Sequence, residues 1–447
     1  MCIICKNNGY IPPDTKVLYC SRCTVLTHLP EYLPDGLEIL WCDDCTVLTH
    51  LPEHLPDGLK ELWCFGCTTL THLPDHLPKG LEKLSCSRCT VLTHLPEYLP
   101  DGLKILSCFD CTVLTQFPEH LPEGLKELLC DGCTALTHFP DHLPDGLEII
   151  WCRGCTNLIF GPSSVIEQVG KEIVESNYHL PVGLKELWCD DCTSLTHFPE
   201  HLPDVLEELW CPGCTALTHL PDHLPKGLKS LWCSGCTALT HFPEHLPDGF
   251  KELWCDYCTV ITHFPDHLPK GLEILACSGC TALTHFPEHL PDELEIIWCP
   301  GCTALTHLPK KLPDGLKELS CDDCTALTHF PDHLPDGLER LWCYDCTALT
   351  HLPKKLPDGL KKVQCSGCTS LIFCPSYAIK QVGKEIVESN YHQWCQKQST
   401  KYFSIRNDSL IAEELVKKAC HPNRIAWYTE WEDWKELESM GMVSSIP

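Results

Sequence analysis

The chain has 447 residues, with 61 Asp and Glu against 33 Lys and Arg, and a formal net charge of −28. A surface this acidic repels phosphate backbones and anionic lipid, so the composition argues against nucleic acid and membrane surfaces as partners. The sequence contains no run of about 18 or more apolar residues, and we therefore expect no membrane-spanning helix.

The cysteine content indicates a reducing compartment. There are 37 cysteines, an odd number that cannot pair completely within one chain. The first residues, MCIICKNNGYIPPD, lack a basic segment followed by a long apolar stretch and do not resemble a signal peptide. Because disulfides persist mainly in oxidising compartments, we expect free thiols and a cytoplasmic location, in the producing cell or in a host cell.

A Cys-x-x-Cys motif recurs along the chain with a fixed period. It begins at Cys20, returns every 22 residues to Cys152, resumes at Cys189 and continues to Cys365, which makes 16 pairs in phase. A shorter copy opens the chain at Cys2 and Cys5. A strict internal period predicts a repeat array. We therefore expect an N-terminal partial repeat or cap at 1–16 and a solenoid at 17–370.

The one interruption of the period also has a copy elsewhere. LIFGPSSVIEQVGKEIVESNYH precedes Cys189, and LIFCPSYAIKQVGKEIVESNYH follows the last repeat, with 18 of 22 residues identical. Apolar residues at helical spacing predict a helical insertion at 159–179, which bulges from one continuous solenoid, and a cap segment at 371–392. The tail, 393–447, shows helix signals and Trp427, Trp431 and Trp434 at helical spacing. Its aromatic stripe either seals the solenoid or docks a partner.

One repeat unit can be interpreted physically. The opening L-x-x-L-x-C alternates as a strand does, with Leu62 and Cys64 on one side and Trp63 on the other. The prolines of L-P-x-x-L-P exclude a helix or an inner strand and favour an extended, polyproline-like return. The glycine that follows is expected to give the turn its conformational freedom. Such units bury their apolar face only by stacking.

The unit resembles the leucine-rich repeat, L-x-x-L-x-L-x-x-[N/C]-x-L, with Cys64 in the third apolar position and Cys67 in the Asn/Cys position. LTHLPEHLPDGLKEL further resembles the short repeats of bacterial type III effectors. The resemblance implies a curved solenoid with a parallel sheet on its concave side and extended segments on its convex side. The cysteine-rich repeats and the tail segment ACHPNRIAWY also resemble repeat proteins of giant amoeba viruses.

The cysteine pairs allow three interpretations. The spacing C-x2-C-x18-C-x2-C lies within the zinc-ribbon pattern, which favours a metal site on spacing alone. The repeat register instead places both cysteines in the core, where a thiol can donate weakly to a neighbouring carbonyl. Redox pairs need an exposed thiolate. We favour the core interpretation and predict neither a metal nor a cofactor.

Histidines form two rows. Thirteen follow the Thr of LTH, from His28 to His351, with Gln116 in that position once. A second row precedes LP, as at His54, and Tyr32 or Lys311 replaces the histidine in other repeats. A row of imidazoles could chelate metal, but a ligand position would not accept such replacements. We expect both rows on a solvated outer face.

Tryptophan is the residue that we assign to function. Alternation along the strand directs the position before the first cysteine away from the core, onto the concave face. Large aromatic residues facing solvent are unusual without a partner. They either stack and stiffen the sheet or form a binding strip flanked by acidic residues. The predicted partner-binding residues are Trp41, Trp63, Trp151, Trp188, Trp210, Trp232, Trp254, Trp298 and Trp342.

These patterns predict a non-catalytic scaffold that binds another protein, with basic and apolar features, on its Trp-rich, acidic concave face. No Gly-rich phosphate loop and no catalytic constellation is recognisable outside the repeats. Three alternatives stay open. One is an adaptor that delivers targets to host ubiquitin machinery through the tail, and another is a Cys- and His-rich metal-binding protein. The third is a carbohydrate binder that uses the aromatic row, although such a protein is usually exported and no export signal is recognisable.

Overall fold

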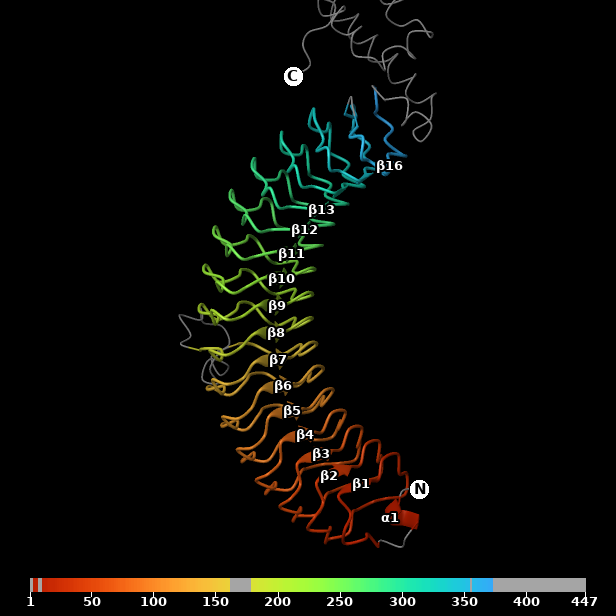
Figure 1. The fold of residues 1–447 in the computed structure, drawn as a ribbon, viewed down its shortest axis with the longest axis vertical. Coiled ribbons are helices and arrows are strands. Elements are labelled where there is room, and N and C mark those ends of the chain that lie inside the picture. Colours follow the sequence, from red (N-terminus) through yellow and green to blue (C-terminus); the bar gives the residue numbers. More distant parts are fainter. Residues whose placement is uncertain (1–2, 7–9, 161–177, 354–355, 373–447) are drawn as a thin grey trace, which may run out of the picture. The chain divides into compact units, whose positions relative to one another are not determined.

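The computed structural model describes residues 3–6, 10–160, 178–353 and 356–372. The chain forms two compact units, Met1–Glu252 and Leu253–Pro447, here termed the N-terminal and C-terminal units (Figure 1). Each repeat contributes one strand of three residues.

The N-terminal unit begins with the short helix α1 (Ile3–Lys6). Its strands are β1 (Val17–Tyr19), β2 (Ile39–Trp41), β3 (Glu61–Trp63), β4 (Lys83–Ser85), β5 (Ile105–Ser107), β6 (Glu127–Leu129), β7 (Ile149–Trp151), β8 (Glu186–Trp188), β9 (Glu208–Trp210) and β10 (Ser230–Trp232). Strand β11 (Glu252–Trp254) includes the division between the units. The C-terminal unit contains β12 (Ile274–Ala276), β13 (Ile296–Trp298), β14 (Glu318–Ser320), β15 (Arg340–Trp342) and β16 (Lys362–Gln364).

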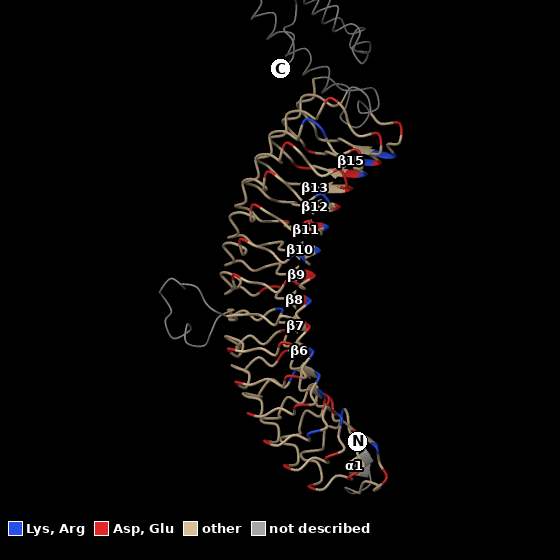
Figure 2. Ribbon diagram, turned by 60° about the vertical axis from the view of Figure 1, so that its left-hand side comes forward, with Lys and Arg blue, Asp and Glu red and all other residues tan. Residues whose placement is uncertain are grey.

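Within each unit, neighbouring repeats pair their strands in parallel and in the same register. Leu40 lies opposite Leu62, and Trp41 lies opposite Trp63, one full period away. Figure 2 shows the strands of each unit, taken by itself, along the inner side of its bend. The predicted leucine-rich-repeat solenoid with a parallel sheet is thereby confirmed.

The interrupted period leaves the sheet of the N-terminal unit intact. Strand β7 pairs directly with β8, with Trp151 opposite Trp188. On the return side, Phe160 stacks between Phe139 and Phe198, with ring centroids 5.8 Å from each. The residues that flank the insertion therefore keep their repeat positions.

The core consists of stacked leucines and cysteines. Leu62 and Cys64 are fully buried, whereas Trp63 is half-buried on the opposite side of its strand. The predicted strand alternation is thus confirmed. No return segment among the described repeats contains a helix, as expected from its prolines.

The interpretation of the repeat glycine was wrong. Gly58 and Gly227, in the L-P-x-G turn, do not have a positive φ. A Cβ on Gly227 would lie 2.6 Å from the carbonyl oxygen of Asp204, so the glycine permits close stacking of neighbouring repeats. The left-handed backbone occurs instead at the second residue between the cysteines, as at Gly213 (φ 73°) and Asp191 (φ 55°).

Several predicted elements fall outside the description. Of the helical insertion 159–179 and the cap segment 371–392, residues 161–177 and 373–392 are outside the described residues, and the flanking residues that are described are not helical. The tail 393–447, with Trp427, Trp431 and Trp434, is also outside them. In the described part, no helix has the length and apolar character needed to cross a membrane.

Candidate functional site

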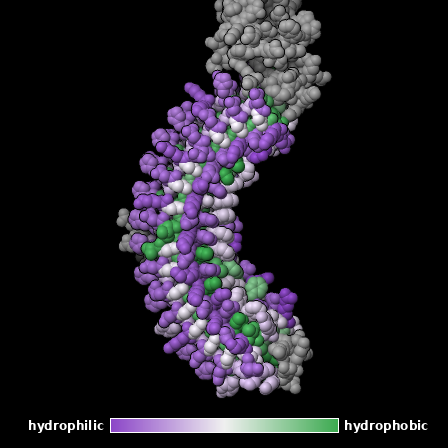
Figure 3. All heavy atoms as spheres, viewed as in Figure 1, coloured by the Kyte–Doolittle hydropathy of each residue, from purple (hydrophilic) through white to green (hydrophobic). Residues whose placement is uncertain are grey.

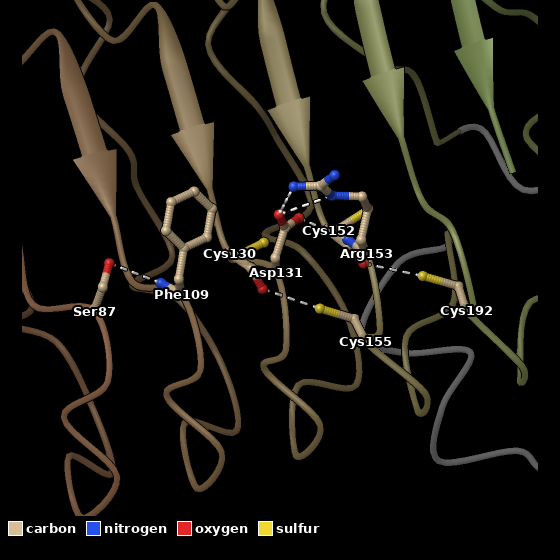
Figure 4. Close-up of polar contacts among 8 residues, drawn as sticks. All are labelled: Ser87, Phe109, Cys130, Asp131, Cys152, Arg153, Cys155 and Cys192. Carbon is tan, nitrogen blue, oxygen red and sulfur yellow. Dashed lines mark hydrogen bonds and ion pairs between the residues drawn. The ribbon is translucent and has the colours of Figure 1, made fainter. Parts of the chain in front are cut away.

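The buried thiols form a hydrogen-bonded ladder between repeats. The second cysteine of a pair donates to the carbonyl of the first cysteine one repeat earlier; Cys67 Sγ lies 3.0 Å from Cys42 O. Figure 4 shows the same contact from Cys155 to Cys130 O and from Cys192 to Cys152 O, both at 3.1 Å. The cysteines therefore act as core residues and as weak donors, as predicted.

Burial opposes the thiolate form that a metal or a redox reaction requires. Burial strongly raises the pKa of Cys130 and Cys152. The thiol of the next repeat that is hydrogen-bonded to each of them, Cys155 or Cys192, is the second cause of the rise. No group of three or more His, Cys, Asp or Glu side chains suited to a metal ion occurs among the residues that the structure describes.

The outer histidine row has a regular geometry. In all thirteen LTH copies the Thr hydroxyl lies within hydrogen-bond distance of the following imidazole Nδ1, for example 3.0 Å between Thr27 and His28. Adjacent rings stack, with centroids 6.2 Å apart for His28 and His50. Most of these rings are exposed on the return side, where we expected them.

The nine predicted tryptophans, termed the tryptophan strip, occupy the last residue of their strands. All are half-buried. Eight of them have another ring of the strip within a centroid distance of 6.5 Å. The longest described run is continuous, with centroid distances of 4.6 Å from Trp151 to Trp188, 5.0 Å to Trp210 and 4.3 Å to Trp232. Stacking and partner binding are compatible, and the binding role stays a prediction.

The surface of each unit is mixed in hydropathy. Figure 3 shows hydrophobic side chains only in separate patches on the viewed face of each unit, among hydrophilic and near-neutral residues. Two carboxylates near the tryptophan strip, those of Glu186 and Asp190, have raised pKa values. Burial, with Glu208 nearby, raises the pKa of Glu186, and burial raises the pKa of Asp190 to about 6.

Several acidic residues between the cysteines have structural roles that the sequence did not reveal. Asp43 accepts the backbone N–H of Phe65 in the next repeat at 3.0 Å, and Asp322 accepts that of Tyr344 at the same distance. Ser87 provides the same contact to Phe109 (Figure 4). A polar residue in the first position of the Cys-x-x-Cys interval thus ties one repeat to the next.

The guanidinium group of Arg153 is bound on the strand face of the N-terminal unit by a carboxylate and two indole rings. Arg153 donates from Nε and Nη2 to Asp131 Oδ2, at 2.9 and 2.6 Å (Figure 4). Its guanidinium carbon also lies 5.6 Å from the Trp151 ring and 5.3 Å from the Trp188 ring. A carboxylate and two indoles therefore hold one planar cation.

The C-terminal unit has a hollow of about 420 Å³ in its strand face. Trp298 and Trp342 form its walls, and Ser320 lies between them in the sheet register. Glu318 and Asp322 also line it, and both are more than nine-tenths buried. In the sequence, Ser320 stands in the position where nine other repeats carry tryptophan.

A second feature that the sequence analysis missed is a charge ladder before the strands. Lys16 and Lys60 flank Glu38 at 2.9 and 2.8 Å. Lys60, with Lys16, lowers the pKa of Glu38 to about 2. Lys126 and Lys185 flank Glu148 in the same way. The signal was present in the sequence, where Lys and Glu alternate at the period of the repeat in runs such as Lys16, Glu38, Lys60 and Glu82.

The fold is that of a leucine-rich-repeat solenoid, a class defined by the chain's own repeat pattern and parallel sheet. Solved structures similar to it include YopM, a leucine-rich effector protein from Yersinia pestis, with 24% identity, a TM-score of 0.47, and coverage of 78% of this chain and 88% of that one. YopM from Yersinia enterocolitica WA-314 has 20% identity and a TM-score of 0.38, with coverage of 79% and 92%.

The leucine-rich repeat domain of the type III effector XopL has 20% identity and a TM-score of 0.38, with coverage of 56% of this chain and 79% of that one. No family model and no curated protein matches the chain. The resemblance to giant-virus proteins stays a prediction.

Proposed function

We propose that the protein is a non-catalytic scaffold whose tryptophan strip and neighbouring carboxylates bind a basic partner protein. The observation that carries this proposal is the register of the sheet, which places Trp151, Trp188, Trp210 and Trp232 in one continuous stacked row on the strand face. Aromatic side chains on a rigid surface lose little entropy on binding and are enriched at interfaces.

The charge of the same face favours a basic partner. Glu186 and Glu208 lie opposite each other on adjacent strands. Each stands two residues before a tryptophan of the strip and therefore on the same face of the sheet. Their mutual repulsion contributes to the raised pKa of Glu186. Lysine or arginine from a partner would relieve this repulsion, and binding would then weaken as salt is added.

The test compares capture of partners from a cell lysate by the wild type and by two matched triple variants. The strip variant replaces with serine Trp188, Trp210 and Trp232, and the outer-row variant replaces with glutamine His197, His219 and His241. Both replacements occur naturally, since serine stands in the strip position at Ser107 and glutamine in the histidine position at Gln116.

We expect the strip variant to lose a salt-sensitive partner that the wild type and the outer-row variant retain. Far-UV circular dichroism and urea unfolding show whether the variants stay folded. Equal capture by the folded strip variant and the wild type contradicts the proposal.

A further inference from the structure

Two gaps in the tryptophan strip of the C-terminal unit behave differently. Ala276 separates Trp254 from Trp298, yet those rings close over it, with centroids 5.5 Å apart at an angle of 72°, and Ala276 is fully buried. At Ser320, between Trp298 and Trp342, the gap stays open as the hollow of about 420 Å³. The tryptophans on either side of Ala276 are therefore in contact, whereas a hollow remains between those on either side of Ser320.

Hydrogen bonds fix the wall of the open gap. Trp298 Nε1 donates to Glu318 Oε1 at 2.7 Å, and Arg340 Nε donates to Glu318 Oε2 at 2.6 Å. Glu318 is therefore already paired with Arg340, and its other carboxylate oxygen holds the Trp298 indole. The hollow is preorganised, so little ordering is required when a ligand enters.

Asp322 is the carboxylate of the hollow without such a cation. Its oxygens accept the Tyr344 backbone N–H at 3.0 Å and the Ser320 hydroxyl at 3.2 Å. No Lys or Arg pairs with it among the described side chains, and burial raises its pKa to about 6. A buried carboxylate in this state gains most from a positively charged ligand.

The Arg153 site in the N-terminal unit indicates which cation fits. Asp131 and Asp322 occupy the same position of the repeat, the first after the cysteine. The next repeat supplies Arg153 to Asp131 but supplies Tyr344, a neutral residue, to Asp322. Asp322 therefore resembles Asp131 with its arginine missing.

The chemistry of the walls suits a planar cation. Trp298 and Trp342 stand on either side of Ser320 in the sheet register, and both indoles line the hollow. Guanidinium is planar, stacks on indole and donates in parallel to carboxylate, whereas an ammonium group is compact and strongly hydrated. Arg340 and Lys362 already approach the Trp342 ring, at 6.0 and 5.6 Å.

We infer that this hollow is a subsite for an arginine side chain of the partner, with its guanidinium between Trp298 and Trp342 and bonded to the Asp322 carboxylate. This inference deepens the proposed function, on which it rests for the identity of the ligand as part of a protein.

The experiment uses the full-length protein labelled with 5-fluorotryptophan and followed by fluorine NMR. The Trp298 and Trp342 signals are assigned from single Trp→Phe variants. The probes are the Nα-acetyl amides of arginine, citrulline, lysine and trimethyllysine. We expect saturable shifts of these two signals with arginine in the millimolar range, and much smaller ones with citrulline, which has the shape without the charge.

Two variants and one control test the contacts. Asp322→Asn should weaken arginine binding about tenfold, because it removes a charge-assisted hydrogen bond. Ser320→Trp fills the gap with the residue that nine repeats carry in this position, and it should abolish the response at the remaining wall signals. Thr303→Ala, at an exposed residue that does not line the hollow, is the control and should leave binding within about twofold of the wild type.

Equal binding of citrulline, tighter binding of lysine or trimethyllysine, or arginine binding that survives Ser320→Trp overturns the inference. This result is separable from the test of the proposed function. Failure of the arginine probe with intact, strip-dependent capture refutes only the subsite, and arginine binding without strip-dependent capture refutes only the proposed partner surface.

Discussion

Removal of one thiol from the cysteine ladder should destabilise the N-terminal unit by about 2 kcal/mol. Cys214 is fully buried, and its Sγ donates to Cys189 O at 3.1 Å. Cys214→Ala removes an atom comparable to a methylene, worth about 0.8 kcal/mol of transfer free energy. A residual void of roughly 25 Å³ adds about 0.6 kcal/mol. Loss of the weak hydrogen bond adds about 0.5 kcal/mol, since the carbonyl still accepts from Cys192 N.

The assay is urea unfolding of the full-length protein, followed by tryptophan fluorescence and by far-UV circular dichroism. Cys111→Ala repeats the measurement at a distant site, where the thiol donates to Cys86 O at 3.2 Å. The double variant should show the sum of the two losses within about 0.5 kcal/mol, since the sites share no contacts. The exposed neighbour Thr215 provides the control, and Thr215→Ala should change the free energy of unfolding by less than about 0.5 kcal/mol.

Unchanged stability of both cysteine variants would refute the core role of the ladder. A different outcome would identify the thiols as metal ligands: a zinc chelator would destabilise the wild type as much as the substitution does, with no further effect on the variants.

Three further predictions concern single positions. Burial raises the pKa of Asp322 from 3.8 to about 6, so the folded state holds this proton more firmly than the unfolded state. As the pH rises through about 4 to 6, the wild type should therefore lose up to about 3 kcal/mol of unfolding free energy relative to Asp322→Asn. Urea unfolding midpoints of both proteins at the two ends of that pH range measure this loss. Gly36→Ala, with nothing within 4 Å of its new Cβ, should be neutral or stabilising by up to about 1 kcal/mol, whereas Gly227→Ala, at 2.6 Å from a carbonyl oxygen, should destabilise by about 1–3 kcal/mol in the same assay. Arg153→Met should lose about 1–2 kcal/mol by leaving the Asp131 carboxylate without its cation, and adding Asp131→Asn should recover part of that loss in a double-mutant cycle.

The strand and its buried face could be predicted because they depend on a local pattern repeated sixteen times. Leu62, Trp63 and Cys64 alternate in the sequence as they alternate across the strand. The cysteine ladder was also predictable, since both thiols fall in apolar positions of the repeat. The alternation can be read within one repeat, and stacking of the repeats gives every copy the same buried face.

The contacts between repeats were less accessible, because they depend on how closely neighbouring units approach. The glycine of the turn was assigned to backbone freedom, but Gly227 serves the approach of the Asp204 carbonyl. The left-handed residue was visible as Gly213 or Gly235, although Asp191 and Tyr257 occupy the same position with positive φ. The hollow at Ser320 depends on contacts between strands, such as the hydrogen bond from Trp298 Nε1 to Glu318 on the next strand.

The alternating Lys and Glu residues before the strands bear on how sixteen nearly identical units find their correct neighbours. From Lys16 through Glu38 and Lys60 to Glu82, opposite charges meet when each unit pairs with the next one. A strand that skipped one unit would bring Lys16 against Lys60. Such a mispaired intermediate would be disfavoured electrostatically during folding, whereas the identical leucine and cysteine positions would accept it. Where Lys and Glu alternate, the exposed charges thus oppose a slip of one unit, which the core alone does not oppose.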